Sequence, residues 1–155
     1  MRIRRRKGGV TAVTILGSRI LVAYDGSDLG RKALHTAARI AGQDPGIELH
    51  IVHVLEPMTI PAYSAGIVDL WERRRENAEL MVSEAKELLQ PTANPVTTHV
   101  MNGTPGECIV RAARELTCDL IVMGSRGLTG IKELFLGSVS HYVAQRAHCP
   151  VLIVK

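Results

Sequence analysis

Short apolar runs alternate with longer segments in which the apolar residues recur at helical spacing, from residue 19 to residue 155. The short runs predict buried β-strands, and the longer segments predict amphipathic helices. The predicted strands are residues 20–24, 49–55, 96–100, 120–123 and 150–154. The predicted helices are residues 29–41, residues 68–89, a segment that begins at Thr104, and residues 138–147.

The apolar positions within each predicted helix identify the face that we expect to be buried. In the first helix they are Ala33, Leu34, Ala37 and Ala41, and in the third they are Ile109, Ala113 and Leu116. In the long second helix they are Trp71, Ala78, Met81, Ala85 and Leu88. Thr104, Pro105 and Glu107 have the pattern of a capping box with a proline at the first helical position.

This alternation predicts the α/β class, with a single open parallel sheet that is covered by helices on both faces. Most of the strands are apolar, as expected of parallel strands that are buried on both sides. Residues 96–100 form the most polar strand and are expected at one edge. The last strand is short and apolar, and an uncovered apolar edge favours association with another strand. We therefore predict a homodimer through Val151–Val154.

Length and charge predict one folded domain that follows a distinct first segment. The 155 residues have the length and composition of one ordinary domain, which we place at residues 19–155. Residues 1–18 contain five of the 19 basic residues and no acidic one, which leaves 14 basic against 15 acidic residues in the remainder. We predict that residues 1–18 form a flexible basic extension. The alternative is that it binds phosphate backbones or an acidic membrane surface.

Composition excludes several classes of function. Aromatic residues make up 3% of the chain, too few for a stacking platform for single-stranded nucleic acid, so nucleic acid is not an expected partner of the folded domain. No uninterrupted apolar run approaches the roughly 20 residues of a membrane-spanning helix. Cys108, Cys118 and Cys149 are odd in number and irregular in spacing. This pattern fits a reduced, cytoplasmic setting better than a disulfide framework or a zinc site.

Two segments that leave strand ends carry the candidate chemistry. One is Asp25-Gly26-Ser27-Asp28, and the other runs from Gly124-Ser125-Arg126-Gly127 to Gly137-Ser138-Val139-Ser140. Open α/β sheets bind ligands beyond the carboxyl ends of their strands, where strand order reverses. If the first and fourth strands are neighbours, the two segments share one crevice. Glycines let the backbone approach a ligand, a helix start favours anions, and further donors and charges come from Ser138, Ser140, Arg126 and Lys132.

The second segment therefore predicts an anion site, although each of its parts also has a structural interpretation. Ser138 is a good helix cap, and glycines are common after strands. The patterns G-x-x-x-x-G-K-[ST] and G-x-G-x-x-G are both absent. A standard P-loop and a dinucleotide-binding Rossmann site are therefore disfavoured.

The spacing Gly124-x2-Gly127-x9-Gly137-Ser138 resembles the G-x2-G-x9-G-[ST] signature of ATP-binding universal stress proteins. The similarity covers Arg19–Lys155, with matching residues at Ile20–Ser27, His53-Val54, Gly103-x-Pro105, Asp119–Ser125 and Cys149–Val154. It implies a Rossmann-like sheet of five parallel strands in the order 3-2-1-4-5 and a dimer through the last strand. Residues 1–18 lie outside the family pattern.

The resemblance also implies an adenine nucleotide (ATP, ADP or AMP), with Mg²⁺, across the ends of the first and fourth strands. Asp25 would lie beside the ribose and phosphates or help to hold the metal ion. Val54 would contact the adenine through its backbone, and Met123 would flank the base. The track of the ribose and phosphates would be lined by Gly124 and Gly127, and its phosphates would be bound by Gly137, Ser138, Val139 and Ser140.

The sequence thus favours an ATP-binding, stress-response regulatory protein that acts as a nucleotide-dependent switch with an unidentified protein partner. No residue is marked as a dedicated catalytic base. His50 and His53 are three apart on one strand, so they point to opposite faces and cannot share a metal ion. The alternatives are a slow Mg-dependent ATPase on the same scaffold and a nucleic-acid or membrane-surface binder that works through the basic extension.

Overall fold

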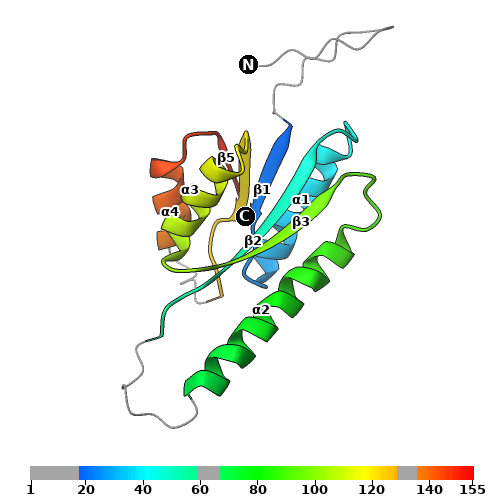
Figure 1. The fold of residues 1–155 in the computed structure, drawn as a ribbon. Coiled ribbons are helices and arrows are strands. Elements are labelled where there is room, and N and C mark those ends of the chain that lie inside the picture. Colours follow the sequence, from blue (N-terminus) through cyan, green and yellow to red (C-terminus); the bar gives the residue numbers. More distant parts are fainter. Residues whose placement is uncertain (1–17, 59–66, 129–135) are drawn as a thin grey trace, which may run out of the picture.

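Strands and helices alternate along the residues that the computed structural model describes, which are 18–58, 67–128 and 136–155. In chain order they are β1 (Arg19–Ala23), α1 (Asp28–Ala41), β2 (Glu48–Leu55), α2 (Ile67–Leu88), β3 (Val96–Asn102), α3 (Pro105–Glu115), β4 (Leu120–Gly124), α4 (Ser138–Arg146) and β5 (Val151–Val154). The five parallel strands form one open sheet with the order β3-β2-β1-β4-β5, and helices pack on both faces (Figure 1). The predicted fold class and strand order are confirmed.

The central strand β1 lies at the point where the strand order reverses. Val22 pairs with Ile51 of β2 on one side and with Val122 of β4 on the other. Because all the strands are parallel, the carboxyl ends of β1 and β4 open at the same edge of the sheet. Ligands of open α/β sheets bind in the crevice at this edge.

Alternate residues of the strands supply two separate cores, one on each face of the sheet. Ile20 and Val22 belong to the core beneath α1 and α2, whereas Leu21 belongs to the core beneath α3 and α4. These side chains are almost completely buried, and burying an aliphatic side chain of this size contributes about 1.5–3 kcal/mol. The predicted buried face of α1 is confirmed at Ala33, Leu34, Ala37 and Ala41.

The helix α2 buries a face that differs in part from the predicted one. Ala78, Val82 and Ala85 form a buried stripe at the helical period, and Leu89 continues it directly after the last residue of the helix. Leu88 is 47% exposed, so the prediction that it is buried is wrong, and Leu89 takes its place. Trp71 stays partly exposed, because the first part of α2 extends beyond the sheet (Figure 1).

The starts of α3 and α4 depart from the predicted caps. Thr104 is the N-cap of α3 and Pro105 follows it, but the Thr104 side chain makes no capping hydrogen bond. The predicted capping box is therefore confirmed in position only. At α4 the N-cap is Gly137, with an extended backbone (φ −72°, ψ 161°), and Ser138 is the first helical residue. The interpretation of Ser138 as the cap is wrong for this reason.

The two edge strands are those that the sequence predicts. The polar strand β3 lies at one edge, and β5 lies at the other with Leu152 37% exposed. Residues 1–17 of the basic extension lie outside the described residues, whereas the N–H of Ser18 donates to the Asp119 carboxylate (2.7 Å). None of the helices in the described segments has the length and apolar character needed to cross a lipid bilayer.

Candidate functional site

The turn after β1 is fixed by its own side chains. Oδ1 of Asp25 accepts a hydrogen bond from the N–H of Ser27 (3.0 Å), and Oγ of Ser27 accepts one from the N–H of Gly30 (3.0 Å). Ser27 is therefore the N-cap of α1. Gly26 has φ +81°, a conformation that glycine adopts without steric cost. These contacts hold the Asp25 carboxylate near the start of α1, where the helix dipole favours a negative charge.

The segment after β4 is held together through the backbone of Ser125. The N–H of Ser125 donates to the carbonyl of Val154 (2.8 Å), and the Ser125 carbonyl accepts from the N–H of Gly137 (2.7 Å). The buried hydroxyl of Ser140 lies 2.8 Å from the Ser125 carbonyl oxygen and 2.9 Å from that of Gly137. The end of β4 and the start of α4 therefore form one unit. Residues 129–135, which include Lys132, lie outside the described residues.

Asp25 and Gly127 lie directly against each other. A Cβ atom at Gly127 would be 2.7 Å from Oδ2 of Asp25, closer than Cβ atoms come to other groups in proteins. The two segments that leave β1 and β4 are therefore adjacent, as the sequence predicts. Gly127 makes room for a carboxylate of the protein itself, in addition to any ligand that its backbone contacts.

The other two signature glycines differ in the space around them. A Cβ atom at Gly124 would lie 2.9 Å from the Cβ of Leu29 and 3.1 Å from its backbone. The first turn of α1 thus packs directly on Gly124. A Cβ atom at Gly137 would find no atom closer than 3.4 Å, an ordinary contact distance. The packing of α1 on β4 therefore requires a glycine at 124 but not at 137.

The residues expected at the adenine lie on the face of the sheet that α3 and α4 cover. Val54 and Met123 both pack on that core, from the strands on either side of β1. Met123 is 5% exposed, and Val54 is partly buried. Nδ1 of His53 lies 2.9 Å from the carbonyl oxygen of Tyr24. This contact ties the end of β2 to the turn that carries Asp25.

The start of α4 offers N–H donors to an anion. The first N–H groups of an α-helix have no partner within the helix, and the dipole makes this end positive. Ser138 and Val139 occupy these positions, and Ser138 is exposed. The hydroxyl of Ser140 is directed at protein carbonyls instead. That Ser140 donates to a phosphate stays a prediction, while its role in shaping the segment is clear.

Two thiols of the described residues have raised pKa values. Burial raises the pKa of Cys118 to about 12, and burial also raises the pKa of Cys149, which is partly buried. Thiols with raised pKa values are poor nucleophiles. Within the described ranges, His, Cys, Asp and Glu form no group of three or more that could hold a metal ion.

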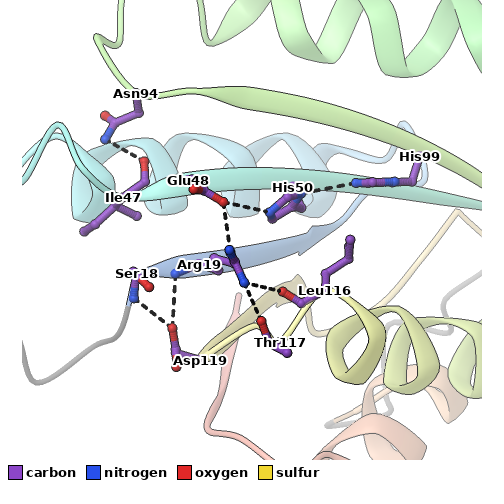
Figure 2. A network of polar contacts seen from close by, with 10 residues as sticks. All are labelled: Ser18, Arg19, Ile47, Glu48, His50, Asn94, His99, Leu116, Thr117 and Asp119. Carbon is purple, nitrogen blue, oxygen red and sulfur yellow. Dashed lines mark hydrogen bonds and ion pairs between the residues drawn. The ribbon is translucent and has the colours of Figure 1, made fainter. Parts of the chain in front are cut away.

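A polar network lies at the amino ends of the strands, away from the candidate site at their carboxyl ends (Figure 2). The Arg19 guanidinium donates to Glu48 (2.9 Å), to Thr117 and to the Leu116 carbonyl. The Asp119 carboxylate accepts from the N–H groups of Ser18 (2.7 Å) and Arg19 (3.2 Å). Because the network joins the amino ends of β1, β2 and β4, it belongs to the scaffold and not to the candidate site.

Two histidines meet beside this network. Nδ1 of His50 lies 3.2 Å from Nε2 of His99, and Nε2 of His50 lies 3.7 Å from Oε2 of Glu48 (Figure 2). Burial, followed by the nearby His99, lowers the pKa of His50, and burial lowers the pKa of His99. His53 contacts Tyr24 instead, so His50 and His53 lie in separate environments, in line with their predicted separation.

Sequence reasoning missed Leu29 and Gly30, and it assigned no role to Ser125. Leu29 and Gly30 make the closest approaches of α1 to Gly124 and Asp25, and Ser125 links β4 to α4. Ser125 acts through its backbone, which no side-chain pattern reveals. Gly30 did carry a signal, because glycine is unfavourable inside a helix and its presence there suggests a close approach by another group.

Comparison with known proteins finds relatives that match most of the chain. A sequence model of the universal stress protein family matches residues 18–155. Universal stress protein YxiE of Bacillus subtilis (strain 168) is 38% identical over 148 residues, covering 89% of this chain and 99% of that protein. The solved structure of hypothetical protein MJ0577 has a TM-score of 0.82 and 29% identity, covering 91% of this chain and 97% of that chain. The solved structure of a universal stress protein in complex with cAMP has a TM-score of 0.66 and 28% identity, covering 90% of this chain and 97% of that chain.

Proposed function

We propose that this chain, which belongs to the universal stress protein family, is an adenine-nucleotide-binding regulatory protein in which the nucleotide acts as a signal. One observation carries the proposal. The Asp25 carboxylate lies against Gly127 of the glycine signature, at the edge where the strand order reverses. The relative in complex with cAMP supports the proposal, because its ligand is an adenine nucleotide.

The phosphate end of the proposed site is the start of α4. The N–H groups of Ser138 and Val139 suit phosphate oxygens, because a helix start is positive and its first donors are unpaired within the helix. Gly127 and Gly137 leave the backbone accessible on the approach to this point. We assign Ser140 to hold the segment in shape through the Ser125 and Gly137 carbonyls.

Asp25 suits the middle of the nucleotide. A carboxylate accepts hydrogen bonds from ribose hydroxyls and is a common ligand of Mg²⁺, which in turn binds phosphate oxygens. Asp25 therefore suits ATP that carries Mg²⁺. The ion would offset the repulsion between the Asp25 carboxylate and the phosphates. Gly124 lies beside this region, and at the other end the adenine ring would contact the backbone of Val54 and lie beside Met123.

We further propose that the switch is a cytoplasmic homodimer joined through β5. The helix α1 connects the two places, because Leu29 contacts Gly124 at its start. Further along α1, a surface cleft of about 380 Å³ is lined by Lys32, His35, Thr36 and Arg39 together with Val154 of β5. A ligand that displaces the start of α1 would therefore alter the surface beside β5, where a second copy and a protein partner could respond.

Calorimetric titration of the nucleotide-stripped chain with Mg-ATP tests this function directly. We expect micromolar affinity and about one nucleotide per chain. The variant that combines Gly127→Val with Ser138→Ala should bind more weakly while keeping the circular dichroism of the parent. Unchanged binding by this folded variant, or an absence of binding to ATP and cAMP by the parent, would contradict the proposal.

A slow Mg-dependent ATPase is the competing interpretation. Phosphoryl transfer requires a positioned nucleophile and stabilisation of charge on the transferred group. Turnover well below about 1 s⁻¹ would support a signalling role for the bound nucleotide. Faster Mg-dependent turnover that is lost in Asp25→Asn would support the enzyme instead.

A further inference from the structure

Gly30 is a buried glycine in the first turn of α1. Alanine is the better residue inside a helix, so a glycine there calls for a reason in the surrounding contacts. A Cβ atom at Gly30 would lie 2.8 Å from Oδ1 of Asp25, 3.2 Å from the Tyr24 ring and 3.3 Å from Oγ of Ser27. The tightest of these contacts is with the carboxylate.

The same carboxylate fills the space beside a second glycine. Oδ2 of Asp25 would be 2.7 Å from a Cβ atom at Gly127. Each oxygen of this one carboxylate thus lies too close to a glycine for a Cβ atom to fit. One of the glycines is on α1 and the other is on the segment after β4. The N–H of Ser27 donates to Oδ1 and fixes the carboxylate between them.

We infer that Gly30 is a positioning residue of the nucleotide site, whose missing side chain allows the Asp25 carboxylate to lie between α1 and Gly127. With a methyl group at residue 30, the carboxylate is the group that must move. Its Oδ1 would be the atom closest to the methyl group, and it belongs to a side chain. Its displacement would break the bond from Ser27 and turn the carboxylate away from Gly127. The consequence for binding rests on the proposed function, whereas the contact itself does not.

The group that Asp25 would hold follows from the chemistry of a carboxylate in a fixed orientation. It accepts hydrogen bonds from ribose hydroxyls, or it binds a divalent cation carried by the phosphates. Either contact depends on direction as well as on charge. A displaced carboxylate therefore loses the contact even though the residue is still aspartate.

Four variants test the inference: Gly30→Ala, Asp25→Ala, the double variant Gly30→Ala/Asp25→Ala, and Lys86→Ala as a control on the exposed face of α2. Each is titrated with Mg-ATP and unfolded by heat. We expect Gly30→Ala to weaken binding about tenfold or more, the loss that follows removal of a hydrogen bond to a charged group. In the Asp25→Ala background, Gly30→Ala should have no further effect on binding. Lys86→Ala should bind as the parent does.

Thermal unfolding separates failure of this inference from failure of the proposed function. Gly30→Ala should shift the melting temperature upward relative to its effect beside Asp25 when residue 25 is alanine, because the closest contact is then absent and only those with Tyr24 and Ser27 remain to oppose the better helix former. The same change should lower the melting temperature, or leave it unchanged, when Asp25 is present. A parent chain that binds no nucleotide but shows this dependence overturns the proposed function alone. Equal shifts in both backgrounds, or full Mg-ATP affinity in Gly30→Ala, overturn the inference.

Discussion

Nδ1 of His50 and Nε2 of His99 lie 3.2 Å apart across β2 and β3, so one nitrogen carries the hydrogen and the other accepts it. The pair can carry one additional proton and keep this contact. A second additional proton would place two N–H groups against each other. The contact between β2 and the edge strand β3 therefore weakens once both imidazoles are protonated.

We predict that the free energy of unfolding falls as the pH drops below about 6.5. The pKa values of His50 and His99 are lower in the folded chain than in the unfolded chain. The unfolded state then binds more protons through this range, and the stability that is complete above it is lost. Urea unfolding at about pH 7.5 and about pH 5.5 measures the difference.

The double variant His50→Gln/His99→Gln identifies the source of this loss. Its difference in unfolding free energy between the two pH values should be smaller than that of the parent chain. His148→Gln is the matched control, because His148 is exposed, and it should keep the parent's difference. An undiminished loss in the double variant would assign the effect to other groups.

Gly124 and Gly137 should respond differently to alanine. Gly124→Ala places a methyl group against Leu29, and overpacking of this kind costs about 1–3 kcal/mol. Gly137→Ala meets only ordinary contacts and should cost less than about 1 kcal/mol. Urea unfolding without nucleotide measures both values. Equal costs would mean that the glycine signature reflects the ligand alone and not the packing of α1.

Ser138 and Ser140 should separate binding from stability. Ser140→Ala removes a buried hydroxyl whose one hydrogen is shared between the carbonyls of Ser125 and Gly137, and it should cost about 1–3 kcal/mol. Ser138→Ala removes an exposed hydroxyl at the start of α4, the phosphate end of the proposed site, so it should weaken Mg-ATP binding. Because the side chain is exposed, the free energy of unfolding should change by less than about 0.5 kcal/mol. Titration and urea unfolding of both variants provide the test. The reverse pattern would show that the two roles are assigned the wrong way round.

The proposed homodimer should depend on the apolar character of β5. Leu152→Asp introduces a charge on this edge strand, and charged residues at sheet edges oppose pairing. We expect sedimentation velocity to show a shift from dimer to monomer. Leu80→Asp on α2 is the matched control, because Leu80 is 61% exposed and lies on another surface. A dimer that survives Leu152→Asp would place the contact elsewhere.

The sequence predicted the sheet well, because its strands are short apolar runs separated by clear turn residues. The burial of α2 was harder to predict. A helix of 22 residues offers several apolar stripes, and only the packing on the sheet selects Leu89 over Leu88. The glycine spacing identified the candidate segment, but it could not show that Gly124 meets Leu29 or that Gly127 meets Asp25. Such contacts join residues distant in sequence.

The bonds from Ser18 and Arg19 to Asp119 have a consequence for the order of folding. They join residues 101 and 100 positions apart, and β1 gains its second neighbour only when β4 is in place. During synthesis β1 can therefore complete its pairing only after most of the chain has emerged from the ribosome. Pairings between such distant segments slow folding. We expect nascent chains that end before β4 to remain sensitive to proteases, and the turn that carries Asp25 to become protected late.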